Sequence, residues 1–205
     1  MDKKIKAVLL TITLLIYVSF TVKVINIFLA DYYHIKGKKL LYRGYLSEAN
    51  DNINKAIKLN YEEPSYHRTN AALFLAALSL KEGDMQKIKQ YALSEMETAY
   101  NLQKINLVNL KHLLSLYYYL SFDDAVDPRE IDDRLKTKTM TFFEEVKDIS
   151  PNDSSVYLTI GKYYGLLKEY ELAEEALEKA LKLKPDLKEA KDELDAVRVK
   201  TGFKA

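Results

Sequence analysis

The titratable side chains of this 205-residue sequence offer little material for catalysis. The three histidines, His34, His67 and His112, lie far apart, and no metalloprotease, serine hydrolase, phosphate-loop or dinucleotide motif accompanies them. The absence of cysteine excludes disulfide scaffolds, thiol catalysis and thiolate metal sites. Asp31 and His34 stand one helical turn apart and could share a metal ion, but no third ligand follows. We therefore expect no enzymatic activity, no cofactor and no metal.

An acidic stretch in the second half of the chain suggests calcium binding at first sight. It lacks the glycine and the twelfth-position glutamate that a calcium loop requires. A solvated loop followed by a helix N-terminus explains the pattern, because carboxylates there favour the positive end of the helix dipole. The residues concerned are Asp123, Asp124, Asp127, Glu130, Asp132 and Asp133.

The overall composition favours a helical chain with a hydrophobic core. Lysine plus arginine number 31 against 30 aspartate plus glutamate, so a net charge of +1 gives no excess field for nucleic acid. Hydrophobic residues make up 48% of the chain and can fill a core. Only 6 glycines and 4 prolines indicate few turns, and therefore mostly helices.

An uncharged apolar segment covers residues 7–22 and follows three lysines within residues 1–6. As a helix it is about 24 Å long, short of a hydrocarbon core of roughly 30 Å, but continued past Lys23 to Ala30 it reaches about 36 Å. Lys23 can extend its long stem toward the headgroups. We therefore expect a single-pass transmembrane anchor over residues 7–30, with residues 1–6 as its basic flank.

Two alternatives to an anchor exist: a cleaved signal peptide and a buried helix of a soluble protein. A signal peptide is disfavoured because no small-x-small cleavage site follows the apolar segment. The positive-inside rule leaves the orientation open, since the basic residues between 36 and 43 balance the N-terminal lysines. If Met1 is the true start, the lysines stay in the cytoplasm, and we expect the rest of the chain outside it.

Internal repeats are indicated by pairs of alanines seven residues apart, where two helical turns return a side chain to the same face. Small residues at such positions let a neighbouring helix approach closely. The pairs are Ala49 and Ala56, Ala92 and Ala99, and Ala173 and Ala180.

The last repeat, residues 154–187, has the spacing W-x-x-L-G-x-x-Y followed by small residues and a proline within 34 residues. The matching residues are Tyr157, Ile160, Gly161, Tyr164, Ala173, Ala180 and Pro185. This segment resembles the tetratricopeptide repeat (TPR). The resemblance implies an all-α solenoid, in which two antiparallel helices per repeat bury their apolar faces against each other and the next repeat.

Three more degenerate repeats precede this one, at about residues 30–63, 64–103 and 104–153. We expect a solenoid of about four repeats over residues 31–187 and a capping helix and tail over residues 188–205. The first helix of the first repeat should continue the membrane segment. The middle repeats pair residues 65–81 with 84–102 and about 106–121 with 128–149, and their length predicts extended second helices.

Two helix starts are indicated by local chemistry. Asp127-Pro128-Arg129-Glu130 is typical of a capping box with proline at the first helical position. Asp186 with Glu189 repeats the acidic spacing before the final helix.

The TPR resemblance also implies a partner-binding groove lined by the first helix of each repeat. Carrying over those positions gives His34, Lys38, Tyr42, Arg68, Lys111, Ser115, Tyr118 and Lys162. Such a groove would be basic with interleaved aromatic rings, suited to an acidic peptide or to stacking on sugar rings. Alternatively, the tyrosines are packing residues and the lysines a solvated surface. The groove lacks the Lys-Asn-Asn carboxylate clamp, since Ser115 and Ala72 replace asparagine.

The chain also resembles the C-terminal TPR tail of bacterial O-antigen ligase-like membrane proteins. The resemblance lies in the order of its segments: an apolar helix, an A-D-Y-Y stretch (residues 30–33), a repeat and an E-P-x-Y-H stretch (residues 63–67). The multi-spanning domain of those enzymes is absent from this sequence. Our main hypothesis is a membrane-anchored TPR scaffold for a protein partner, in cell-envelope polysaccharide assembly. The alternatives are a tail or split subunit of a ligase- or polymerase-like glycosyl-transferring membrane enzyme, and a secreted repeat protein.

Overall fold

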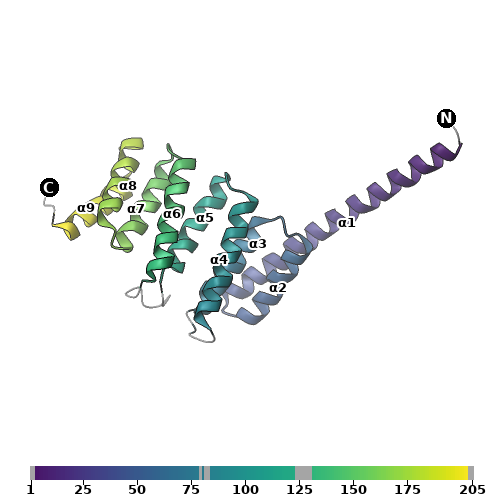
Figure 1. Cartoon of the computed structure of the whole chain (residues 1–205), viewed down its shortest axis with the longest axis horizontal. Helices are drawn as coiled ribbons and strands as arrows, with labels where there is room; N and C mark the ends of the chain where they lie inside the picture. Colours follow the sequence, from purple (N-terminus) through teal and green to yellow (C-terminus); the bar gives the residue numbers. More distant parts are fainter. Residues whose placement is uncertain (1–2, 79, 81–83, 123–130, 203–205) are drawn as a thin grey trace.

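The computed structural model describes residues 3–78, 80, 84–122 and 131–202. These residues form nine α-helices, which confirms the all-α solenoid (Figure 1). The helices are α1 (Lys3–Tyr42), α2 (Leu46–Leu59), α3 (Pro64–Leu78), α4 (Met85–Leu102), α5 (Leu107–Leu120), α6 (Asp133–Ile149), α7 (Ser154–Leu166), α8 (Tyr170–Leu183) and α9 (Lys188–Thr201).

The helices pack as four successive pairs, α1 with α2, α3 with α4, α5 with α6 and α7 with α8, and α9 closes the stack. The first helices of the pairs also contact one another, so α1, α3, α5 and α7 form one layer of the solenoid. In Figure 1 the pairs follow one another from α2 to α9, and the N-terminal half of α1 projects beyond them. A layer built from the first helices is the surface on which the predicted groove residues should meet.

In the first and last helix pairs, α1 with α2 and α7 with α8, close packing depends on a glycine. A Cβ added to Gly161 of α7 would lie 2.7 Å from Leu177 Cγ, and one added to Gly37 of α1 would lie 2.8 Å from Ile53 Cγ1. Both distances are shorter than any normal contact, so the helix pairs could not approach as closely with a larger residue. The glycine and the residue it packs against have the same spacing in both pairs, Gly37 with Ile53 and Gly161 with Leu177.

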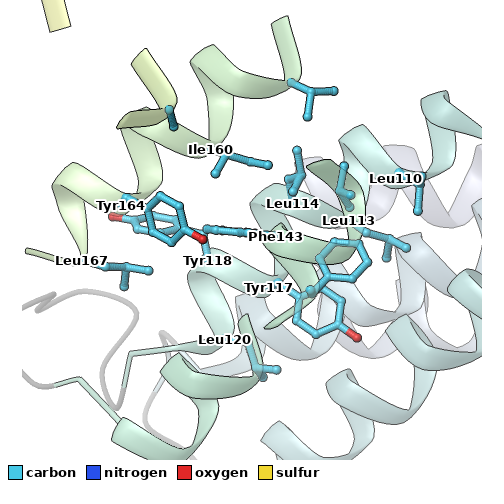
Figure 2. Packing of buried hydrophobic residues seen from close by; sticks show 14 of the residues in the cluster. Leu110, Leu113, Leu114, Tyr117, Tyr118, Leu120, Phe143, Ile160, Tyr164 and Leu167 are labelled. Atoms are coloured by element: carbon cyan, nitrogen blue, oxygen red, sulfur yellow. The ribbon is translucent and has the colours of Figure 1, made fainter. Parts of the chain in front are cut away.

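Hydrophobic packing divides the solenoid into a large core and two small clusters. The large core extends from Ala71 of α3 to Val197 of α9. Figure 2 shows its central aromatic rings, among them Tyr118, Phe143 and Tyr164. The small clusters attach the first repeat, through Ala30, Ala56 and Tyr66 in one and Ala49, Ile53 and Leu73 in the other.

Helix α1 is one continuous helix of 40 residues, as expected for an apolar segment that continues into the first repeat. Among the described residues it is the helix that is long and apolar enough to cross a membrane, over Lys4–Tyr42 with a mean hydropathy of 2.2 in its most apolar window. A helix of this length and composition near an N-terminus is typical of a membrane span or of a signal sequence.

The second helices of the middle repeats are extended, as expected: α4 has 18 residues and α6 has 17, against 14 in α2 and in α8. The predicted start of α6 is wrong. The helix begins at Asp133, because the Asp132 side chain accepts hydrogen bonds from the backbone N–H groups of Arg134 and Leu135 and so caps it. The predicted capping box at residues 127–130 lies outside the described residues.

The predicted cap at Asp186 is also wrong. The N-cap of α9 is Leu187, and it makes no side-chain capping bond. Asp186 precedes the cap by one residue, and the Glu189 carboxylate instead accepts a hydrogen bond of 2.7 Å from Lys162 Nζ. An inter-repeat ion pair therefore uses the acid that the capping box would need.

Candidate functional site

A pocket of about 360 Å³ lies between α1, α3 and α5. Five of the eight predicted groove residues line it: His34, Lys38, Tyr42, Arg68 and Ser115. Its remaining lining residues are Leu41, Ser65, Thr69, Ala72, His112 and Leu116. We call this the α1–α3–α5 pocket, and it combines cationic, hydroxyl, aromatic and aliphatic groups from three repeats.

Arg68 is held in this pocket by Asn109, at the start of helix α5. Its Nη1 donates a hydrogen bond to the Oδ1 of Asn109. Asn109 is buried, and its Nδ2 donates to the backbone carbonyls of Ala99 at 2.7 Å and Gln103 at 3.2 Å. Because both ends of the Asn109 amide are used, the guanidinium of Arg68 has a fixed position and retains further N–H donors for a ligand.

His34 is held by α3. Its Nε2 lies 2.8 Å from the Thr69 hydroxyl, and that hydroxyl donates its only proton to the carbonyl oxygen of Ser65 at 2.9 Å. The Thr69 oxygen therefore accepts from His34 Nε2–H, and the Nδ1 atom of the neutral ring remains an acceptor. Burial lowers the pKa of His34, nearby Lys38 lowers it further, and Asp31 and Glu63 partly oppose the shift.

Burial also lowers the pKa of His112, and the positive charges of Arg68 and Lys38 add to the shift. The pKa of Arg68 is lowered by burial and raised by Glu63. Both histidines are consequently neutral at pH 7, while Lys38 and Arg68 are charged. The positive charge of the pocket at neutral pH thus comes from two cations on neighbouring helices, and lower pH can add two more.

The charges of the other predicted groove cations are compensated within the chain. Lys111 donates to Asp153 at 2.8 Å and to the Ser155 hydroxyl at 2.6 Å, and Lys162 pairs with Glu189. Within the part of the chain that the structure describes, neither Lys38 nor Arg68 forms an ion pair with a carboxylate. The positive field of this surface is therefore concentrated in the α1–α3–α5 pocket.

Tyr118 is a core residue and does not line the pocket. Its side chain is buried, and its ring stacks on Tyr163 with centroids 4.5 Å apart. Figure 2 shows it among the packed rings around Phe143. The interpretation of the tyrosines as packing residues holds for Tyr118, whereas Tyr42 is exposed at the edge of the pocket.

Several site residues are not among the predicted groove residues, and the polar ones with a clear role are Thr69, Asn109 and His112. His112, one residue after the predicted Lys111, lies on the face of α5 that lines the pocket. Ser115, three residues after His112, could have identified the correct face, since both line the pocket. Thr69 and Asn109 act through tertiary contacts that no local pattern reveals.

The residues matched to the repeat template differ in burial. Gly161, Tyr164, Ala173 and Ala180 are buried, and the Tyr164 hydroxyl donates to Glu144 at 2.5 Å. Tyr157 is half-buried beneath the Lys179 ammonium, and Pro185 is exposed in the turn after α8.

A shared metal between Asp31 and His34 has no support in the geometry. Asp31 Oδ1 accepts a hydrogen bond of 2.5 Å from the Tyr66 hydroxyl, while His34 turns to Thr69. Over residues 3–78, 80, 84–122 and 131–202, no three histidine, aspartate or glutamate side chains gather as metal ligands do. Of the acidic stretch considered for calcium, residues 123–130 lie outside the described part.

The family model of the tetratricopeptide repeat matches residues 154–187. The last repeat is a tetratricopeptide repeat. This match covers α7, α8 and the turn before α9, where the packing residues above gave the clearest signature. The other three TPR-like pairs are assigned by the fold.

Several solved structures share this helical fold over 80–85% of the chain. A thermophilic TPR protein of Thermus thermophilus is 21% identical over 85% of this chain and 84% of that chain, with a TM-score of 0.53. MamA from Desulfovibrio magneticus RS-1, residues 41 to its end, is 17% identical over 85% and 86%, with a TM-score of 0.54. YrrB, a TPR protein with an unusual peptide-binding site, is 16% identical over 80% and 73%, with a TM-score of 0.51. These identities show the fold alone, and no curated protein sequence matches the chain.

Proposed function

We propose that this protein is a non-enzymatic, membrane-anchored scaffold that binds an acidic segment of a protein partner in the α1–α3–α5 pocket. The proposal rests on a difference among the basic residues on the layer formed by α1, α3, α5 and α7. Lys111 and Lys162 are neutralised by carboxylates of the chain itself, whereas Lys38 and Arg68 converge on a pocket without such a partner among the described residues.

A carboxylate is the ligand group that this pocket complements. Arg68 is fixed by Asn109 and can offer parallel N–H donors, and Lys38 supplies a second charge from the opposite helix. Leu41, Leu116 and the exposed ring of Tyr42 give apolar surface beside these charges. Because neighbouring helices lie about 8–10 Å apart, a segment of roughly six extended residues spans the three helices.

The TPR fold supports a protein-binding role, since such solenoids present an extended surface built from successive repeats. YrrB shows that a solenoid of this kind can carry a peptide-binding site. The apolar part of α1 supports the anchoring, and we place the solenoid outside the cytoplasm. The A-D-Y-Y and E-P-x-Y-H stretches suggest cell-envelope polysaccharide assembly as the setting.

The proposal is tested by purifying the full-length protein from its native membranes after crosslinking. A Lys38→Glu/Arg68→Glu variant is compared with a Lys188→Glu/Lys191→Glu control, which makes the same charge change on exposed positions of α9. We expect the wild type and the control to retain the same partner and the pocket variant to lose it. Equal recovery from all three proteins would reject the pocket as the binding site.

A further inference from the structure

The two faces of α1 change from apolar to polar at different heights. On the face that carries the solenoid, Lys23 lies 3.7 Å from Glu62 of the loop between α2 and α3. About two helical turns further, Ala30 is fully buried against Ala56 and Tyr66. On this face the first repeat begins to cover α1 at Ala30, and the exposed ion pair of Lys23 with Glu62 lies at the edge of that contact.

The opposite face remains apolar and open well beyond Lys23. Ile25, Phe28, Tyr32 and Ile35 follow at intervals of three and four residues, and the Phe28 side chain is 78% exposed. At 100° per residue these positions centre about 180° from Ala30, so they point away from the solenoid. We call this set the α1 outer stripe. It continues the apolar surface of residues 7–22 on the same helix, and Lys36 and Lys39 follow it.

The edge of the hydrocarbon layer cannot lie at the same residue level on both faces of α1. An expected span of residues 7–30 would bring Lys23, Glu62 and the neighbouring Glu63 into the membrane, where charged groups are costly. A boundary level with Lys23 all around the helix would instead leave Ile25 and Phe28 in water. A tilted helix resolves both conflicts, because one of its faces leaves the hydrocarbon before the other.

We propose that α1 crosses the membrane obliquely, with the outer stripe lying against the lipid surface and the solenoid-bearing face turned away from it. The inference rests on the membrane anchoring proposed above. From Lys23 to Phe28 the helix rises about 7.5 Å, which across a helix about 10–12 Å wide corresponds to a tilt of roughly 35°. Membrane helices reach such tilts.

Lipid fits the outer stripe in composition as well as in position. Tyr32 would lie at headgroup level, where aromatic rings with a polar tip are favoured. Lys36 and Lys39 would then meet the phosphates of anionic lipids. The tilt holds the solenoid, and with it the α1–α3–α5 pocket, above the membrane surface and not against it.

The chain contains no tryptophan, so single tryptophans can report depth in the full-length protein. Three variants at exposed aromatic positions are reconstituted into vesicles of phosphatidylcholine and phosphatidylglycerol with brominated acyl chains: Tyr17→Trp, Phe28→Trp and Tyr61→Trp. Tyr61 is next to Glu62 in the chain and therefore lies near the level of Lys23. Measured along the axis of α1, this level is closer to the apolar segment of residues 7–22 than Phe28 is. An upright helix therefore predicts at least as much quenching for Tyr61→Trp as for Phe28→Trp.

We expect strong quenching of Tyr17→Trp, clear quenching of Phe28→Trp, and at least threefold weaker quenching of Tyr61→Trp. Quenching of Tyr61→Trp equal to or above that of Phe28→Trp would overturn the tilt while leaving the anchor intact. An unquenched but blue-shifted Phe28→Trp would show that a second copy or a partner helix covers the stripe, which also overturns the inference. Absence of quenching in Tyr17→Trp would reject the membrane anchoring itself.

Discussion

At the scale of single residues, Gly161 determines how closely α7 and α8 pack. Gly161→Ala places a Cβ 2.7 Å from Leu177 Cγ, so we expect a loss of about 1–3 kcal/mol in the free energy of unfolding. Gly165→Ala in the same helix is the matched control, because its nearest new contact is 3.4 Å from Val197 Cγ2. Urea unfolding followed by circular dichroism measures both. Similar losses in the two variants would contradict the interlock.

Asp153 links stability to pH at the same scale. Burial raises its pKa, but hydrogen bonds from Lys111, Ser155 and the Val156 N–H outweigh burial and lower the pKa to about 2. A lowered native pKa stabilises the fold above the unfolded value of 3.8, and this stabilisation is lost as pH falls from about 3.8 to 2. We expect Asp153→Asn to cost roughly 1–2 kcal/mol at pH 7 and about a third of that at pH 2.5. A cost independent of pH would refute this linkage.

At the scale of helices, the three elements around the pocket should make ligand binding depend on pH. His34 and His112 have lowered pKa values, so both are neutral at pH 7.5 and gain charge as pH falls. The other charged groups that act on these rings are the cations Lys38 and Arg68 and the acids Asp31 and Glu63. Because a bound anion stabilises the protonated forms of His34 and His112, the affinity of the pocket for an acidic peptide rises as the pH falls.

The probe for this effect is a fluorescent hexapeptide of alternating glutamate and glycine, titrated by anisotropy. We expect binding to strengthen at least threefold between pH 7.5 and 5.5. A His34→Gln/His112→Gln variant should lose most of that change, whereas His67→Gln should keep it, since His67 is buried between Glu95 and the Tyr61 carbonyl, away from the pocket. An unchanged pH profile in the first variant would contradict the role of the two histidines.

Helix existence followed from sequence more reliably than helix starts did. Periodic apolar residues and paired alanines act within one helix and between neighbours, so the pairs α1–α2 and α7–α8 were predictable in detail. The start of α6 was not, because Asp132 and not the proline-containing stretch provides the cap. The pocket was predictable in part: His34, Lys38 and Arg68 follow from repeat register, but the compensation of Lys111 by Asp153 depends on tertiary contacts 42 residues apart.

At the scale of the whole molecule, a solenoid couples each repeat mainly to its neighbours. Ala180 is fully buried in α8, so Ala180→Glu buries an unpaired charge and should destabilise the last repeat by about 3 kcal/mol or more. Hexapeptide binding by the distant α1–α3–α5 pocket should stay within twofold of wild type. Ala196→Glu on the exposed face of α9 is the control. Loss of peptide binding in Ala180→Glu would show long-range coupling that a solenoid should not have.

The central claim is that the α1–α3–α5 pocket contacts a protein partner, and site-specific photocrosslinking in native membranes tests it most directly. A benzophenone amino acid replaces Tyr42, which lies exposed at the pocket, or Tyr91 of α4, which is exposed outside it. We expect a discrete protein adduct from position 42 alone, and its disappearance when Arg68→Glu is added. The same adduct from position 91, or an adduct at position 42 that persists with Arg68→Glu, would contradict the claim.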